Sequence, residues 1–146
     1  TMGFGLPAAV AAKLTYPDRT VVAFTGDGDF LMTGQEFATA VQYGANIIVL
    51  VGNNGMYGTI RMHQERDYPG RVSGTGLVNP DFAAYAEAFG GFGAIVEKTA
   101  DFAPAFEAAK QSGKPAIIEI RIDPDAVSPV ATLSGLRQAA LEKAKR

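Results

Sequence analysis

The sequence predicts an α/β domain built on a parallel sheet with helices on both faces. Three short apolar, β-branched runs, at residues 21–24, 47–51 and 116–122, are typical of strands. The first two do not alternate apolar with polar residues, which indicates strands buried on both faces. Segments with helical periodicity separate the strands, and this arrangement favours a parallel sheet over an antiparallel one.

The expected order of elements is helix, strand, helix, strand, helix, helix, strand, helix. After the first strand, the helical segments are residues 35–43, 80–89, 101–111 and 134–146. Asn79 is expected to cap the second of these, with Pro80 at its first position and Gly90 ending it. Asp101 is expected to cap the third. The polar, Gly-rich stretch 67–78 is expected to be a long surface loop.

Composition limits the class of protein. The chain has 146 residues, the size of one domain, with 47% hydrophobic and 19% charged residues, which excludes a disordered chain. A net charge of −2 gives no sign of nucleic-acid or membrane binding. The absence of Cys excludes disulfides and thiol chemistry. No leader or long apolar run is present, so we expect a cytoplasmic protein. Because the chain opens directly on Thr1-Met2-Gly3, we expect a domain, residues 1–146, that is truncated at its N-terminus.

Small and polar residues follow the first two predicted strands. Gly26-Asp27-Gly28-Asp29 follows the first strand, and Gly52-Asn53-Asn54-Gly55 follows the second. Ligands bind at the carboxyl ends of strands in open α/β sheets. The carboxylate of Asp27 and the side-chain carbonyl of Asn54 supply two hard oxygens, and phosphate oxygens and water complete a Mg²⁺ shell. The pair therefore predicts a metal-bridged diphosphate.

Two plainer interpretations compete with this one. Asp-Gly and Asn-Gly are ordinary turn signals, so each motif alone is weak. Both motifs at a suitable spacing arise by chance only about 3 times in 10,000, which favours a ligand site. The segment 3–8 also fits a dinucleotide fingerprint, but no strand precedes it and no suitable acidic residue follows.

The Gly-Asp-Gly triplet, 24 intervening residues and Asn53-Asn54 resemble the thiamine diphosphate signature of decarboxylases and acetolactate synthases. The opening segment 2–9 is similar to one that these enzymes carry 25 residues before the motif Asp. Gln35-Glu36-Phe37 matches their helix after the motif. The resemblance covers essentially the whole chain, as most of one diphosphate-binding domain.

The resemblance implies specific roles. Mg²⁺ would be held by Asp27, the Asn54 side chain and the backbone carbonyl of Met56. Met2 would support the bent cofactor beneath its thiazolium ring, and Thr59 and Ile60 would face the thiazolium and the substrate. Backbone contacts to the cofactor would come from residues in both motifs: Gly26, Asp27, Gly28, Asp29, Met56, Tyr57 and Gly58.

The resemblance also implies an acetolactate synthase-like enzyme that decarboxylates a 2-oxo acid and joins the remaining fragment to an acceptor. The family's catalytic Glu lies on a separate pyrimidine-binding domain of the same or a partner chain, so no catalytic residue is assigned here. We therefore expect this chain alone to be inactive. The enzyme to which it belongs is expected to be a homodimer or homotetramer. A flavin (FAD) would be bound only through domains absent from this chain.

Several alternatives stay open. The alternative to an acetolactate synthase-like enzyme is a decarboxylase of an aryl or indolyl 2-oxo acid or of oxalyl-CoA, and a non-catalytic docking module is a further hypothesis. Asp29 stands where the family usually has a small residue, and His63 where plant and yeast acetolactate synthases have Trp. Side chains with two competing interpretations, a solvated or structural position against a role in the site, are Glu36, Arg61, His63, Arg66 and Arg71.

Overall fold

The computed structural model describes residues 1–144, which fall into two compact units. The first, here called the sheet unit, comprises Thr1–Asn53 and Asn79–Arg121. The second, here called the helix-pair unit, comprises Asn54–Val78 and the chain from Ile122 onward.

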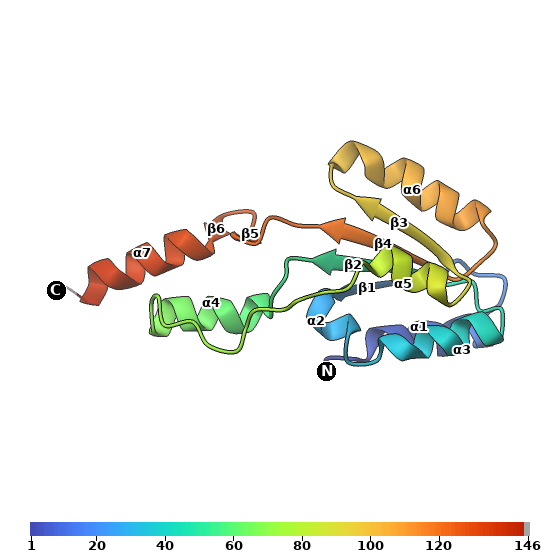
Figure 1. The fold of residues 1–146 in the computed structure, drawn as a ribbon, viewed down its shortest axis with the longest axis horizontal. Coiled ribbons are helices and arrows are strands. Elements are labelled where there is room, and N and C mark those ends of the chain that lie inside the picture. The colour runs from blue at the N-terminus through green and yellow to red at the C-terminus, as the bar shows by residue number, and fades with distance from the viewer. Residues whose placement is uncertain (145–146) are drawn as a thin grey trace. The chain divides into compact units, whose positions relative to one another are not determined.

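The sheet unit contains a four-stranded parallel sheet (Figure 1). Its strands β1 (Val22–Gly26), β2 (Ile48–Asn53), β3 (Phe92–Val96) and β4 (Ala116–Arg121) lie in the order β1-β2-β4-β3. Gly26 is in register with Gly52, and Val51 with Glu119. The carboxyl ends of β1, β2 and β4 therefore lie along one edge of the sheet, as the sequence predicts.

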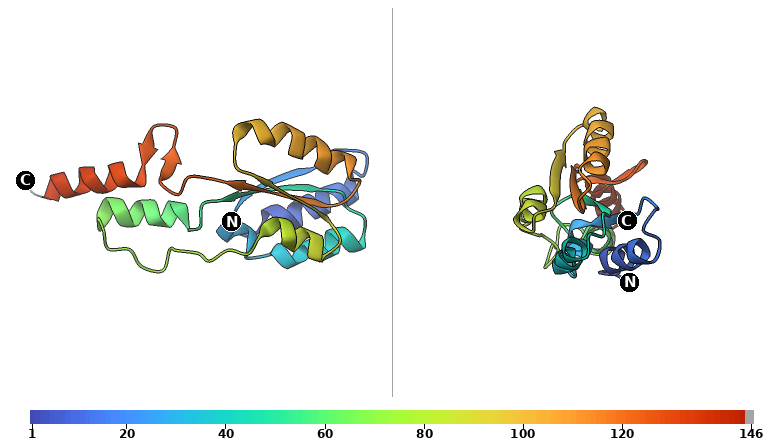
Figure 2. Two further views of the ribbon diagram at one scale, coloured as in Figure 1. Left: turned by 45° about the horizontal axis from the view of Figure 1, so that its top comes forward. Right: turned by 90° about the vertical axis from the view of Figure 1, so that its right-hand side faces the viewer.

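Helices cover both faces of this sheet, which confirms the predicted architecture (Figures 1 and 2). On one face lie α1 (Gly5–Thr15), α3 (Phe37–Gln42) and α5 (Phe82–Ala88), whose apolar side chains share one core with alternate residues of β2. On the other face, α6 (Thr99–Gln111) packs on β3 and β4 around a smaller core. The turn α2 (Asp27–Phe30) follows β1 directly, and the short 3-10 helix η1 (Gly34–Glu36) precedes α3.

Strand β3 is absent from the expected order of elements. Its sequence includes Gly93 and Ala94, which have low β-propensity and weaken the local strand signal of the segment. It becomes a strand because it pairs with β4 along its full length. A Cβ at Gly93 would lie 2.2 Å from the carbonyl oxygen of Ala83, so helix α5 approaches this strand closely enough to require glycine.

The predicted capping residues are partly wrong. Helix α5 begins at Phe82 and is capped by Asp81, whose carboxylate accepts from the Ala84 amide at 2.8 Å. Asn79 lies outside the helix and makes other contacts, described below. Helix α6 begins at Thr99, which leaves Asp101 inside its first turn. Gly90, with φ of +85°, follows the end of α5 as predicted.

The helix-pair unit consists of α4 (Gly58–Asp67), α7 (Leu133–Ala144) and a short antiparallel hairpin of β5 (Ala126–Ser128) and β6 (Ala131–Thr132). Figures 1 and 2 show α4 and α7 side by side. Helix α4 is absent from the expected order of elements, whereas the long loop after it is confirmed. The terminal helix starts one residue before its predicted position, and its last two predicted residues lie outside the described chain. None of the helices in residues 1–144 has the length and apolar character needed to cross a membrane.

Candidate functional site

The carboxylate of Asp27 is fixed at the end of β1. Asp27 is buried, with only 2% of its surface exposed. The Gly28 amide donates to Oδ1 at 2.8 Å, and Nδ2 of Asn79 donates to Oδ2 at 2.7 Å. A buried charge is stable only when it is paired or hydrogen-bonded, and both oxygens of Asp27 meet this requirement.

Asn79 joins the ends of two neighbouring strands. The same Nδ2 that donates to Asp27 also donates to Oδ1 of Asn53 at 2.8 Å. Asn53 is the last residue of β2, so one side-chain amide connects the ends of β1 and β2 within the sheet unit. Asn79 therefore connects two strands and does not cap a helix, contrary to the prediction from the sequence.

Glu119 on β4 extends this network. Its carboxylate, 2% exposed, accepts from Nδ2 of Asn53 at 2.9 Å, from the Phe82 amide at 3.2 Å and from Nε of Arg121 at 3.2 Å. The Phe82 bond satisfies a free amide at the start of α5. Sequence analysis missed this residue, although a Glu within the apolar run 116–122 was a usable signal, because Glu is almost never buried without a partner.

Asp29 connects the opening segment to the first motif. Its carboxylate accepts from the Gly3 amide and from the Thr25 hydroxyl. The Thr33 hydroxyl donates to the Gly3 carbonyl at 2.8 Å. The unusual carboxylate at position 29 thus turns toward the chain's own N-terminal segment and holds Gly3, the neighbour of Met2, at a φ of +79°.

The residues of the sheet unit fit a bound cation and diphosphate in their chemistry. Among residues 1–144, no three His, Asp or Glu side chains come together as a metal cluster, so a cation at Asp27 needs neutral and ligand oxygens to complete its shell. Oδ1 of Asn79 is a buried acceptor without a partner among the described residues. A Cβ at Gly26 would meet no atom of its unit within 4 Å, which leaves room for a ligand.

The second motif begins the helix-pair unit. Oδ1 of Asn54 accepts from the Met56 amide at 3.1 Å, and the Tyr57 amide donates to the Thr75 carbonyl at 2.9 Å. A Cβ at Gly58 would lie 2.8 Å from Nδ2 of Asn54, so glycine at this position makes room for that side chain. The predicted contacts of these residues with a diphosphate stay a prediction.

The remaining predicted cofactor-binding side chains lie at the surface of their own units. Met2 is 46% exposed in the sheet unit, and Ile60 is 50% exposed at the start of α4. Thr59, beside Ile60, is also exposed. Their accessibility suits side chains that face a ligand, but their roles stay a prediction.

Four polar side chains considered as site candidates have local, structural partners. Glu36 accepts from the Thr39 hydroxyl at 3.0 Å. On α4, exposed His63 accepts at Nδ1 from Arg66, which also pairs with Asp67 at 3.0 Å. The guanidinium of Arg71 lies 5.9 Å from the centre of the Tyr68 ring.

Arg61 departs from the expectation of a solvated basic run, because it pairs at 3.0 Å with Glu65, which is fully buried. Glu65 also accepts from Arg137 of α7 and from the Gly70 amide. The hydrogen bond from Arg137, chiefly, lowers the pKa of Glu65 to about 2, against the opposing effect of desolvation. This ion pair joins α4 to α7 and was missed by sequence analysis.

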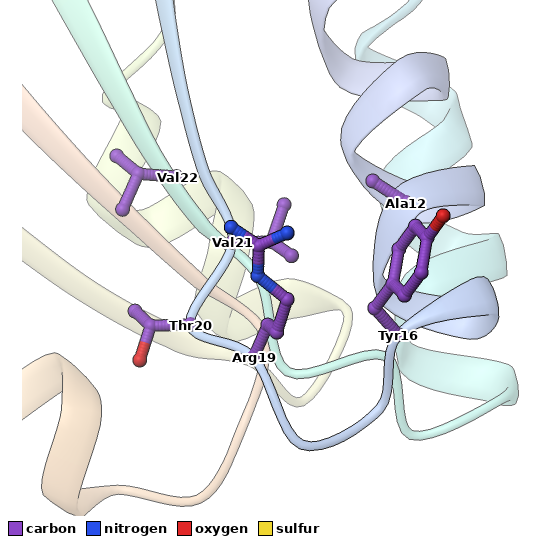
Figure 3. A pocket seen from close by; sticks show the side chains of 6 residues that line it. All are labelled: Ala12, Tyr16, Arg19, Thr20, Val21 and Val22. Carbon is purple, nitrogen blue, oxygen red and sulfur yellow. The ribbon is translucent and has the colours of Figure 1, made fainter.

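A small pocket lies at the opposite end of β1 from Asp27 (Figure 3). It is lined by residues from the end of α1 to the start of β1: Ala12, Tyr16, Arg19, Thr20, Val21 and Val22. None of the predicted site residues lines it, so it is separate from the Asp27 network.

Comparison with known proteins shows what this chain is similar to. Residues 1–120 match the family described as "Thiamine pyrophosphate enzyme, C-terminal TPP binding domain". A putative thiamine pyrophosphate-containing protein of Bacillus subtilis is 42% identical over 123 residues, covering 84% of this chain and 21% of the relative. An acetolactate synthase large subunit of Haemophilus influenzae is 46% identical over 94 residues, covering 64% of this chain and 16% of the relative.

A solved structure is also similar. The Rhodococcus jostii RHA1 thiamine diphosphate-dependent 4-hydroxybenzoylformate decarboxylase superposes with a TM-score of 0.77 at 36% identity, covering 84% of this chain and 23% of that chain. The chain spans about a fifth of the length of the curated relatives it matches.

Proposed function

Since the chain belongs to the thiamine pyrophosphate enzymes, as their C-terminal cofactor-binding domain, we propose that it holds thiamine diphosphate through Mg²⁺ in an acetolactate synthase-like enzyme. The observation that carries the proposal is the buried Asp27 carboxylate, fixed at the carboxyl end of β1 by the Gly28 amide and by Asn79. A carboxylate of this kind is a hard, oriented oxygen donor of the type that Mg²⁺ prefers.

Each remaining residue has a defined task in this proposal. By the family resemblance, the side-chain oxygen of Asn54 and the backbone carbonyl of Met56 would supply the protein's further Mg²⁺ ligands. Open space at Gly26 admits the diphosphate. Met2, whose neighbour Gly3 is held by Asp29 and Thr33, would contact the cofactor. Thiamine diphosphate, when bound, supplies the electron sink for decarboxylation of a 2-oxo acid, while the protein binds and orients it.

Two reactions are candidates for the enzyme to which this chain belongs. Several similar proteins are acetolactate synthases, which favours decarboxylation of a 2-oxo acid followed by carboligation. A specific observation supports the second candidate, decarboxylation of an aryl 2-oxo acid: the similar solved structure is a 4-hydroxybenzoylformate decarboxylase. Product analysis separates the two: carboligation to a second 2-oxo acid yields CO₂ and a longer 2-hydroxy-3-oxo acid, whereas simple decarboxylation yields CO₂ and an aldehyde.

The chain is proposed to need a partner domain. The relatives it matches are about four times as long as this chain, and we infer that a pyrimidine-binding domain of the same or a partner chain supplies the catalytic Glu. A homodimer or homotetramer satisfies this requirement.

Calorimetry on the protein in its naturally encoded length tests the proposal. We expect thiamine diphosphate to bind only with Mg²⁺ present, and Asp27→Ala to weaken binding more than about 100-fold, beyond the loss typical of outer partners. Asp18→Ala, at an exposed aspartate of the same unit, is the matched control and is expected to bind normally. Absence of binding in the unsubstituted protein would favour a docking module instead.

A further inference from the structure

We propose that Asn79 is a positioning residue of the metal site, which holds the Asp27 carboxylate in its metal-binding orientation before the cation arrives. The inference rests on the proposed function, since it concerns the same carboxylate. It assigns to the segment before α5 a task that neither of the two predicted motifs contains.

The orientation of the Asn79 amide follows from its partners. Its nitrogen lies 2.7 Å from Oδ2 of Asp27 and 2.8 Å from Oδ1 of Asn53. An ionised carboxylate only accepts hydrogen bonds, so the side facing Asp27 must be the NH₂ group. An amide nitrogen has two N–H bonds, and these two acceptors use both.

The second partner of Asn79 is itself fixed from the far side. Nδ2 of Asn53 donates to Oε1 of Glu119 at 2.9 Å, and this buried carboxylate also accepts from Arg121. Two amides thus connect two carboxylates, from Glu119 on β4 through Asn53 on β2 to Asp27 after β1. Each amide is oriented by the carboxylate to which it donates, so neither can flip without placing an oxygen against a negative charge.

The same anchor fixes the backbone that carries Asn79. Oε2 of Glu119 accepts from the Phe82 amide, and Asp81 caps the helix that begins there. Asn79 therefore stands only three residues before a helix start that is tied to β4. A metal-binding carboxylate held in this way loses little conformational freedom when the cation binds, and removal of such an outer partner typically costs 10–100-fold in metal affinity.

The test is a Mg²⁺ titration of the naturally encoded protein in the presence of thiamine diphosphate. We expect Asn79→Ala and Asn79→Leu to raise the Mg²⁺ dissociation constant by about 10–100-fold. The Leu variant keeps most of the side-chain volume, so it separates loss of the donors from loss of packing. Asn46→Ala, at an exposed asparagine just before β2, is the matched control: it removes an amide that takes no part in this network and is expected to leave Mg²⁺ affinity within about threefold.

A double-mutant cycle gives a readout that a merely structural role would not move. Glu119→Gln is expected to weaken Mg²⁺ binding less than Asn79→Ala, and the two effects are expected to be less than additive, because both act through the same chain of bonds. Asn79 variants that keep the native circular dichroism spectrum and bind Mg²⁺ within twofold of the unsubstituted protein would overturn the inference. Fully additive effects of Asn79→Ala and Glu119→Gln on the Mg²⁺ dissociation constant would also overturn the inference. Failure of the unsubstituted protein to bind Mg²⁺ would instead refute the proposed function, and the inference with it.

Discussion

At the scale of single residues, three buried carboxylates organise this protein, and each has its own set of donors. Asp27 accepts from an amide and a side chain, Glu119 from three donors, and Glu65 from two guanidinium groups and an amide. Burying an ionised carboxylate without such donors is prohibitively unfavourable. The positions of these donors therefore decide where a charge can be placed.

The ion pair at Glu65 predicts acid sensitivity of the helix-pair unit. The folded pKa of about 2 lies below the ordinary value of 4.5, so the unfolded chain takes up the proton first as the pH falls. The stability contributed by this group is fully present above about pH 4.5 and is lost progressively toward pH 2. We expect the amide hydrogen-exchange protection factors in α4 and α7, corrected for the intrinsic exchange rate at each pH, to fall over this window.

Two variants give this prediction its control. Glu65→Gln removes the titrating group, and we expect it to lower stability by about 1–3 kcal/mol near neutral pH and to flatten the response below pH 4.5. Glu107→Gln removes an exposed pair with Lys110 and is expected to change stability by less than about 1 kcal/mol. An acid response in Glu65→Gln equal to that of the unsubstituted protein would contradict the assignment.

At the scale of elements, β3 and α5 show how packing overrides local propensity. Gly93 weakens the strand signal of its segment, yet only glycine allows the Ala83 carbonyl to approach so closely. Gly93, which weakens the strand signal, is therefore also the residue that allows α5 to pack on β3. The Asp81 cap and the Glu119 bond then determine where α5 begins.

Gly93→Ala tests this close approach. The added methyl would lie 2.2 Å from a carbonyl oxygen of the backbone, so α5 must move away from the sheet. We expect a loss of about 1–3 kcal/mol in the free energy of unfolding, measured by urea denaturation. Gly5→Ala, where a Cβ meets no neighbour, is the control and is expected to be neutral or slightly stabilising. Equal stability of the two variants would show that the contact imposes no constraint.

At the scale of the whole molecule, apolar side chains on the edge strand of the sheet unit are exposed. In the sheet formed by the described residues, β1 is an edge strand, and its Phe24 and Val22 are 74% and 44% exposed, so the prediction that this strand is buried on both faces is wrong. Exposed apolar side chains on an edge strand favour association with another chain or domain. That the domain works with partners stays a prediction.

We therefore expect the isolated residues 1–146 to self-associate. In sedimentation velocity, the sedimentation coefficient should rise with protein concentration, and Phe24→Ser should weaken this association by about tenfold or more, as burial of one Phe contributes about 1.5–3 kcal/mol. Tyr43→Ser, at an exposed aromatic residue on the end of α3, is expected to have a smaller effect. A monomer that does not change on dilution would contradict the prediction.

The sequence by itself determined the class of fold, three of the four strands of the sheet, and both motifs at the strand ends. These features depend on residue periodicity and on neighbours in the chain, which a linear sequence contains directly. The family resemblance followed from the same local patterns and is confirmed by the match over residues 1–120.

Only the tertiary structure decided the contacts of Asn79, Asn53 and Glu119. Asn79 and Asp27 are 52 residues apart, and Asn53 and Glu119 are 66 residues apart. Their hydrogen bonds exist because β2 lies between β1 and β4 in the sheet, an order that no local pattern specifies. Side-chain hydrogen bonds between residues so far apart in the chain form only where the strands that carry them become neighbours. Burial of the two apolar faces of the sheet determines this order of the strands.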